Sequence, residues 1–353
     1  MNQSPQPLNF LEVLAQTKTS VWPFIQKYLV QSLQFPEFCQ IDPKYQPELD
    51  FHQQIISDYP TRQGKYLRPT LVVNTALSMG ESLEKVIPVA AAMQLSEEWI
   101  LIHDDIEDDS LERRGAPTLH RQIGKELALN AGDSLHVIMW KMIFDYQNPK
   151  ITEEFYHLLN RTTFGQTIDI NWTKTNKTDL TDEDVLLILE SKTCYYTISG
   201  PMRLGAIVAG ASVDQLNQIY LFGRYLGRAF QIIDDVLDLT SDFSGLKKQP
   251  FNDLYEGKRT IILSHLLRTA SPSEKKEIIE ILSKTRDQKS EVEVNRIFSL
   301  ITQYHSLDYA KELAQQFAAQ AKKILSDDLG FIKVEPYRHQ LEMAIDFIIN
   351  RQH

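Results

Sequence analysis

Two segments of the chain share the pattern D-D-x-x-D, and each directly follows an apolar run. The first spans residues 104–108 and the second spans residues 234–238. Aspartates four residues apart share one face of a helix, where like charges cost about 0.2–0.5 kcal/mol per pair. Acids at the C-terminal end of a helix also oppose its dipole. A chain that repeats this arrangement therefore needs something to compensate for the repulsion.

Either acidic segment alone is as well explained by a solvated helix end as by a metal site. The second copy favours the metal site. Ile232, Ile233, Val236 and Leu237 surround its aspartates, so this helix end is expected to be partly buried. Buried carboxylates require cations or protonation. Mg²⁺ is commonly held by one or two carboxylates together with substrate phosphates, so two facing clusters would form a multi-metal diphosphate site.

Basic residues lie beside both acidic segments. Any one of these pairs alone is typical of a solubilising surface. Their occurrence beside two carboxylate clusters favours phosphate ligands, because Arg forks and Lys ammonium groups match phosphate oxygens. The basic residues concerned are Lys65, Arg68, Arg113, Arg114, Lys248, Lys258 and Arg259.

Composition narrows the choice of function. The net charge of −10 argues against a nucleic-acid-binding protein, which needs a basic face. Gly accounts for only 14 of 353 residues, which disfavours β-propellers and glycine-loop nucleotide binders. Cys39 and Cys194 cannot form a disulfide framework, and no signal peptide or apolar run of membrane-spanning length is evident. We expect a soluble cytoplasmic protein with no stable membrane insertion.

The apolar spacing is helical along most of the chain. Helices are expected at 71–77, 85–105, 125–144, 300–325 and 337–349, and another at 182–190 with Thr181 as its N-cap. Polar stretches at 171–181 and 283–291 are expected to be loops. The prediction is an all-α protein. Residues 1–50 form an N-terminal helical extension, with helix within 11–33, and residues 51–353 form the main domain.

Seven ordered motifs resemble those of the trans-isoprenyl diphosphate synthases, the polyprenyl synthetase family, from about residue 60 to the C-terminus. Gly64–Pro69 resembles G-K-x-x-R-P, and Asp104–Gly115 resembles the first aspartate-rich motif with its R-R-G ending. Phe230–Asp238 resembles the second motif, F-Q-x-x-D-D-x-x-D. The other four are Ala131–Asp133 (A-G-D), Gly165–Asp169 (G-Q-x-x-D), Lys192–Thr193 (K-T) and Asp253–Thr260 (D-L-x-E-G-K-x-T). The resemblance implies an isoprenoid synthase-type helical bundle around a central active-site cavity, and a homodimer.

The resemblance also implies a reaction. Isopentenyl diphosphate would condense head-to-tail with an allylic diphosphate whose departure is assisted by Mg²⁺. Asp104, Asp108 and Asp234 would hold the metal, with Asp105, Asp235 and Asp238 supporting them. The implied contacts are Arg113, Lys192 and Lys258 to the allylic diphosphate; Lys65, Arg68 and Arg114 to isopentenyl diphosphate; and Thr193 and Gln231 to the allylic cation.

Two positions depart from the family pattern. Glu97 occupies a position where many bacterial members carry a His that touches isopentenyl diphosphate. A carboxylate there repels the substrate unless it is paired or protonated. Either Glu97 pairs with a neighbouring base, or the substrate binds differently. The second departure is minor, because Lys248 still falls at the expected position although Lys247 precedes it in place of Gly.

Product length is expected to depend on the residues four and five positions before the first aspartate, Ile100 and Trp99. Bulky residues at these positions stop elongation in the family, and Trp99 has the largest side chain available. The combination resembles short-chain synthases that make C15 or C20 products. The alternative is that Trp99 is an ordinary packing residue.

Other functions remain as alternatives. A class I terpene cyclase would share the fold and first motif, but its second site more often reads N-x-x-x-S/T-x-x-x-E. A longer-chain synthase would share all seven motifs. A silent regulatory partner subunit tends to lose the aspartates, which are intact here. His103 has no second His at ligand spacing, and no P-loop or dinucleotide motif occurs.

Overall fold

The structure is a computed structural model that describes residues 8–240 and 251–350. Helices make up most of the described chain, and its strands are the two short arms of one hairpin. The all-α prediction is confirmed. The chain separates into two compact units. The first comprises the described parts of Met1–Glu154, Pro201–Ala211 and Ile332–Met343. The second comprises those of Phe155–Gly200, Ser212–Phe331 and Ala344–His353.

The first unit is built around helix α4. Its elements are α1 (Phe10–Gln31), the 3₁₀ turns η1 (Glu37–Cys39) and η2 (Pro43–Tyr45), α2 (Gln46–Arg62), α3 (Leu67–Ser78), α4 (Leu83–Glu107), strands β1 (Glu112–Arg113) and β2 (Ala116–Pro117), α5 (Leu119–Ile123) and α6 (Lys125–Tyr146). Most of α9 (Gly200–Val208) and the start of α16 (Tyr337–Asn350) also belong here.

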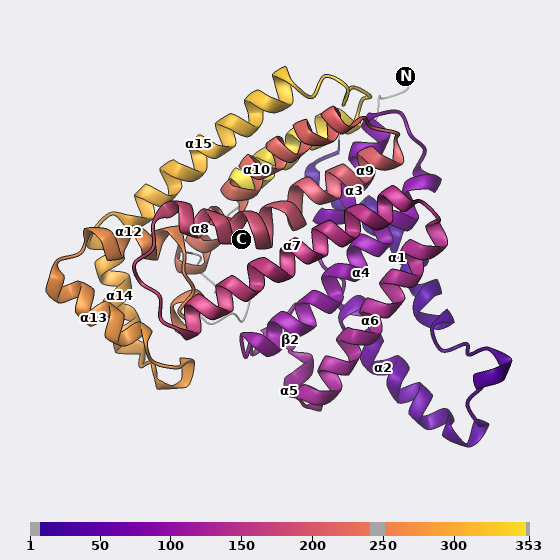
Figure 1. Cartoon of the computed structure of the whole chain (residues 1–353), viewed down its shortest axis with the longest axis horizontal. Coiled ribbons are helices and arrows are strands. Elements are labelled where there is room, and N and C mark those ends of the chain that lie inside the picture. Colours follow the sequence, from indigo (N-terminus) through magenta and orange to yellow (C-terminus); the bar gives the residue numbers. More distant parts are fainter. Residues whose placement is uncertain (1–7, 241–250, 351–353) are drawn as a thin grey trace, which may run out of the picture. The chain divides into compact units, whose positions relative to one another are not determined.

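Helix α4 is the central helix of this unit because α1, α2, α3, α5 and α6 all pack against it. It packs along α6, α3 and α1, and α4 and α6 lie side by side in Figure 1. Residues 89–96 are all buried, and three of them are consecutive alanines that let neighbouring helices approach closely. Residues 89–96 are thus a buried helical stretch, although Gln94 and Ser96 within it are polar. This packing fixes the position of the acidic C-terminal end of α4.

The second unit carries the other acidic segment. Its elements are the larger part of α7 (Pro149–Lys174), α8 (Asp182–Ile188), the π-helical segment η3 (Leu189–Ser199), α10 (Val213–Thr240), α11 (Asn252–Glu256), α12 (Ile261–Thr269), α13 (Pro272–Leu282), the 3₁₀ turn η4 (Arg286–Gln288), α14 (Glu291–Gln303), α15 (Ser306–Asp327) and the end of α16. The π-helix is of interest because such segments are frequently found at functional sites.

Helix α10 organises this unit by packing against both η3 and α15, and Figure 1 shows α10 and α15 side by side. Two glycines allow the close approach of η3. A Cβ on Gly223 would lie 2.3 Å from the Ser199 Cβ, and one on Gly227 would lie 2.5 Å from the Cys194 Cα. Helix α15 carries buried alanines along one of its faces, at residues 310, 314, 318 and 321.

Most of the helix predictions agree with the structure, including the capping box in which Thr181 and Asp184 exchange hydrogen bonds at the start of α8. Two expectations were wrong. The stretch 300–325 is not one helix, because α14 ends at Gln303 and α15 begins after His305, which has a left-handed backbone (φ 54°). The expected loop at 171–181 is shorter, since α7 continues to Lys174. In the described residues, none of the helices has the length and apolar character to cross a membrane.

The close approach of η3 to α10 gives a test of this packing. Gly227→Ala should lower the free energy of unfolding by about 1–3 kcal/mol, because the new methyl group would overlap the Cys194 backbone. Urea denaturation monitored by circular dichroism measures this change. Gly330→Ala is the matched control, since nothing lies within 4 Å of its Cβ position. Equal midpoints for the two variants would contradict the packing described.

Candidate active site

The first acidic segment ends α4. The helix closes at Glu107, and the backbone N–H of Asp108 donates to the Asp104 carbonyl (2.9 Å), so Asp104 and Asp108 lie one turn apart. Both side chains are partly exposed, whereas Asp105 is fully buried. Asp104 and Asp108 therefore have the accessibility that a metal ligand needs, and Asp105 has a different environment.

Asp105 anchors the hairpin that follows α4. Its Oδ2 accepts a hydrogen bond from the Tyr59 hydroxyl (2.6 Å) and another from Arg113 Nε (3.1 Å), and its Oδ1 accepts from Arg113 Nη2. Burial opposes the charge of Arg113, but the hydrogen bonds to Asp105 outweigh it and raise the pKa of the guanidinium group. Asp105 thus orients Arg113 and the β1–β2 turn, in which Arg114 and Gly115 have positive φ.

Glu97 and Glu98 lie two turns earlier on α4 and pair with arginines. Glu97 Oε2 is 3.1 Å from Arg68 Nη1, and its Oε1 is 3.6 Å from Arg114 Nη2. Glu98 Oε2 accepts from Arg114 Nη1 (2.8 Å). Of the two alternatives for Glu97, the structure shows the one in which the carboxylate pairs with neighbouring bases. Gly64 makes room for this pairing, because a Cβ there would lie 2.7 Å from Arg114 Nη2.

The rest of the G-K-x-x-R-P segment lies at the start of α3. Lys65 is exposed, and the next residue, Tyr66, is buried with a left-handed backbone (φ 61°) as the helix N-cap. This conformation is uncommon for a bulky residue. It joins the segment that carries Lys65 to the helix that carries Arg68.

Trp99 is buried on α4, with 7% of its surface exposed, and it packs against two histidines. Its ring centroid is 4.6 Å from that of His136 on α6 and 5.7 Å from that of His103. The His136 ring is fixed in turn, since Trp140 Nε1 donates to its Nε2 (2.8 Å). Ile100 is partly exposed. Trp99 is therefore held rigidly between α4 and α6.

In the second unit, the structure brings Thr193, Gln231 and Asp235 together. The Thr193 hydroxyl donates to Gln231 Oε1 (3.0 Å), and Gln231 Nε2 donates to Asp235 Oδ1 (2.9 Å). Burial raises the pKa of Asp235 to about 8, and the neighbouring Asp234 also raises it. Asp234 is exposed and Asp238 is partly exposed. The second segment thus repeats the first, with a buried middle aspartate and more accessible outer ones.

Lys192 and Lys258 both pair with carboxylates in this unit. Lys192, on η3, donates to Asp169 Oδ2 on α7 (3.1 Å). The helices approach closely at Gly165, where a Cβ would lie 2.5 Å from the Lys192 backbone nitrogen. Lys258 Nζ lies 2.7 Å from Glu256 and 3.7 Å from Asp253. Lys248 lies outside the described residues.

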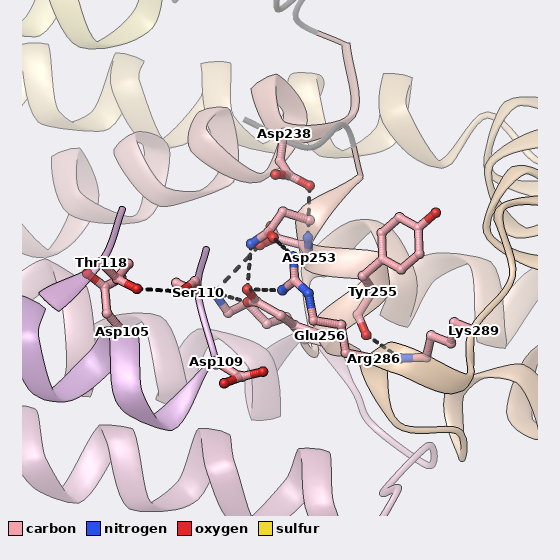
Figure 2. A network of polar contacts seen from close by, with 12 residues as sticks. Asp105, Asp109, Ser110, Thr118, Asp238, Asp253, Tyr255, Glu256, Arg286 and Lys289 are labelled. Carbon is pink, nitrogen blue, oxygen red and sulfur yellow. Dashed lines mark hydrogen bonds and ion pairs between the residues drawn. The ribbon is translucent and has the colours of Figure 1, made fainter. Parts of the chain in front are cut away.

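A polar network holds the segment at 253–256 that precedes Lys258, and Figure 2 shows its members Asp238, Asp253, Tyr255, Glu256, Arg286 and Lys289. The Asp253 N–H donates to Asp238 Oδ2 (3.0 Å), which ties this segment to the end of α10. Arg286 pairs with Glu256 (2.9 Å), and Lys289 Nζ donates to the Tyr255 carbonyl (2.6 Å). Burial lowers the pKa of Lys289 to about 8, with nearby Arg259 adding to the effect.

Sequence reasoning did not single out several of these residues. Asp253 and Glu256 lie within a quoted motif, so their acidity was a usable signal. Arg286 and Lys289 reach residues 253–256 from a segment about thirty residues further along the chain, and nothing local marks them. Tyr59 and Glu98 likewise show their roles only through contacts with Asp105 and Arg114.

The donor set suits a hard divalent cation. Asp235 at the end of α10 is buried, and the nearby Asp234 and Asp238 add negative charge. Burial also raises the pKa of Asp253 on α11 well above its ordinary value, and Asp238 and Glu256 raise it further. Lys258 offsets only part of this charge. Within residues 8–240 and 251–350, no three His, Cys, Asp or Glu side chains converge on a point that would hold a bare cation. Mg²⁺ sites often share their ligands between carboxylates and substrate phosphates, and this arrangement fits that pattern.

Comparisons with known proteins agree with this picture. The polyprenyl synthetase family model matches residues 50–301. The geranylgeranyl diphosphate synthase of Saccharolobus solfataricus is 31% identical over 73% of this chain and 78% of its own length. A short chain isoprenyl diphosphate synthase of Methanocaldococcus jannaschii is 33% identical over 78% of this chain and 86% of its own.

A solved structure shows the same fold. The geranylgeranyl pyrophosphate synthase of Corynebacterium glutamicum, complexed with isoprenyl diphosphate and magnesium, superimposes with a TM-score of 0.83 at 24% identity, covering 98% of this chain and 100% of that one. The fold is thus the all-α fold of isoprenoid synthases. The family match and the relatives above 30% identity go further, and the chain belongs to the polyprenyl synthetase family of prenyltransferases.

The buried position of Glu98 gives a testable pH dependence. Burial raises the pKa of Glu98 to about 7, against roughly 4.3 in an unfolded chain. Between pH 4.3 and pH 7, roughly, the Glu98 carboxyl keeps its proton in the folded state but loses it in the unfolded state. The stability that the protonated Glu98 gives the folded state is therefore present at low pH and is lost as the pH rises through about 7. Because Gln does not titrate, the stability of Glu98→Gln does not fall in this way as the pH rises. Relative to the wild type, the variant should gain about 2–3 kcal/mol between pH 5 and pH 8.

Urea denaturation at the two pH values measures this difference. Glu84→Gln, in an exposed position on the same helix, is the matched control that removes an equal charge. A difference between wild type and Glu98→Gln that is the same at both pH values would contradict the role of burial.

Proposed function

We propose that the chain condenses isopentenyl diphosphate head-to-tail with an allylic diphosphate and releases a short-chain C15–C20 prenyl diphosphate. The observation that carries the proposal is that both aspartate-rich helix ends are intact and each has a lysine or arginine fixed beside it. The relatives named geranylgeranyl and short chain isoprenyl diphosphate synthases support the reaction class.

The two acidic helix ends have matching roles in this proposal. Asp104 and Asp108 on α4 and Asp234 on α10 hold Mg²⁺. Asp105 and Asp235 support them from buried positions, and Asp238 supports them from a partly exposed one. When bound, Mg²⁺ neutralises the charge that develops on the leaving diphosphate. The Corynebacterium glutamicum structure, described as containing isoprenyl diphosphate and magnesium, supports this choice of cation.

The basic residues bind the two diphosphates. Arg113, Lys192 and Lys258 contact the allylic diphosphate, and Lys65, Arg68 and Arg114 contact isopentenyl diphosphate. Lys248 follows the second acidic segment and is assigned to substrate binding by the motif alone. Fixing both substrates converts a bimolecular step into an effectively unimolecular one.

The chemistry then needs no side-chain nucleophile. The allylic C–O bond breaks and the diphosphate leaves with the electron pair. Thr193 and Gln231, already hydrogen-bonded to each other, present oxygen dipoles that stabilise the allylic cation. The isopentenyl double bond attacks this cation, and the product cation loses a proton to the departing diphosphate.

Three broader features complete the proposal. The protein functions as a homodimer, as the family resemblance implies. It acts in the cytoplasm, which is supported by a described chain without a membrane-spanning helix. Residues 1–50 form an extension to the catalytic domain at 51–353, supported by a family match that begins at residue 50.

The reaction is tested by incubating the purified protein with isopentenyl diphosphate, Mg²⁺ and dimethylallyl, geranyl or farnesyl diphosphate, followed by chromatography. A linear prenyl diphosphate is expected, and its formation should stop when EDTA removes the metal. Asp234→Asn should lower kcat by about 100-fold or more, because it removes a metal ligand. The matched control on the same helix is Asp214→Asn, an exposed position in the first turn of α10.

Other products would identify other functions. A cyclised hydrocarbon would favour a terpene cyclase, and a longer product would favour a longer-chain synthase. If no product forms with any allylic primer, the protein is not a prenyltransferase under these conditions, and the regulatory-subunit alternative is favoured.

Trp99 is the expected floor of the product channel. Trp99→Ala should lengthen the main product by one or more isoprene units, because it removes the bulky ring held between α4 and α6. Chromatography of the products measures the chain length. Trp22→Ala on α1 is a control for losing a half-buried indole elsewhere. An unchanged product would leave Trp99 as a packing residue.

A further inference from the structure

Two arginines of the first unit are already paired with internal carboxylates. Arg68 comes from the start of α3, and Arg114 comes from the β1–β2 turn. Glu97 contacts both, at 3.1 Å and 3.6 Å, whereas Glu98 contacts Arg114 at 2.8 Å. Two cations and two carboxylates are therefore already joined by ion pairs before any ligand binds. An anionic ligand that binds these two arginines must therefore compete with carboxylates that already pair with them.

The two carboxylates are not held equally. Glu98 is buried, with 1% of its surface exposed, and it also accepts a hydrogen bond from Gln94 Nε2 (2.6 Å). Glu97 has 15% of its side chain exposed, and its two ion pairs are longer than that of Glu98. A carboxylate that reaches solvent and makes longer contacts is the one that an incoming anion can replace.

We propose that Glu97 is a displaceable internal counter-ion, which occupies Arg68 and Arg114 in the free enzyme and gives way to the diphosphate of isopentenyl diphosphate. Glu98 stays with Arg114 and keeps that guanidinium in position. The inference rests on the proposed function, because it assigns these arginines to that substrate. It adds a residue that sets the affinity of one substrate and not of the other.

The arrangement has two consequences for binding. Glu97 holds the arginines in place before the substrate arrives, so less side-chain freedom is lost on binding. Each anion must also break these ion pairs, and this lowers the affinity for any diphosphate, including the inorganic diphosphate that the reaction releases. Two unit charges about 4 Å apart in a partly buried site shift a binding equilibrium by more than about tenfold.

Steady-state kinetics test the proposal. Glu97→Gln should lower the KM for isopentenyl diphosphate by about tenfold, and should change the KM for the allylic substrate by less than about twofold. Glu84→Gln, about 20 Å away along the same helix, is the matched control for losing one negative charge. Glu97→Asp keeps the charge but draws the carboxylate back by one methylene, so an intermediate fall is expected.

A double-mutant cycle separates a direct contact from a general charge effect. The gain from Glu97→Gln should shrink in an Arg68→Ala background, because the cation that Glu97 occupies is absent. A gain of equal size in both backgrounds would overturn the proposal, as would a Glu97→Gln variant whose KM for isopentenyl diphosphate matches that of Glu84→Gln.

Calorimetry with inorganic diphosphate tests the inference even without turnover. Glu97→Gln should bind this anion more tightly than the wild type by about the same factor. Equal binding by the two proteins overturns the role of Glu97. A wild-type protein that makes no prenyl product, although Glu97→Gln binds diphosphate more tightly, would instead refute the proposed function and leave the counter-ion in place.

Discussion

Repulsion among carboxylates is the constraint that shapes both acidic helix ends, that of α4 in the first unit and that of α10 in the second. At each end, aspartates crowd together where the helix dipole already disfavours negative charge. The two units respond in the same way. A middle aspartate turns inward and is held by neighbours, Arg113 and Tyr59 in one case and Gln231 in the other. The outer aspartates remain more accessible. Repulsion is thus reduced by dividing each cluster into a structural member and ligand-facing members.

The basic residues of the two units are likewise held by partners within the protein. Lys192, Lys258 and Arg68 each have a carboxylate partner within the protein. In a protein with a net charge of −10, such pairing orders the cations before a ligand binds. It also makes ligand binding an exchange of partners. The affinity for phosphate is then set by how tightly each internal acid holds its base, as the contrast between Glu97 and Glu98 illustrates.

Much of the fold could be predicted from the sequence, because apolar spacing and caps such as Thr181 are local signals. The break between α14 and α15 could not be predicted. It depends on the left-handed backbone of His305, and the sequence has no glycine there to signal such a conformation. At the site, the motifs located the aspartates and lysines. They did not reveal Arg286, Lys289 or Tyr59, whose roles come from contacts between segments distant in sequence. The pairing of Glu97 with Arg68 and Arg114 is visible only in the structure, because the sequence pattern is compatible with both alternatives.

The π-helical segment η3 makes this part of the chain intolerant of changes in length. Its wide turns place Lys192 beside Asp169 and Thr193 beside Gln231 at the same time. Loss of one residue would convert a π turn into an α turn and change which side chains between Leu189 and Ser199 face α7 and α10. Conservative substitutions at the partly buried positions of η3 keep this spacing, whereas a single-codon deletion would separate the two side chains from their partners. Natural variation in this segment is therefore expected to take the form of replacements at constant length.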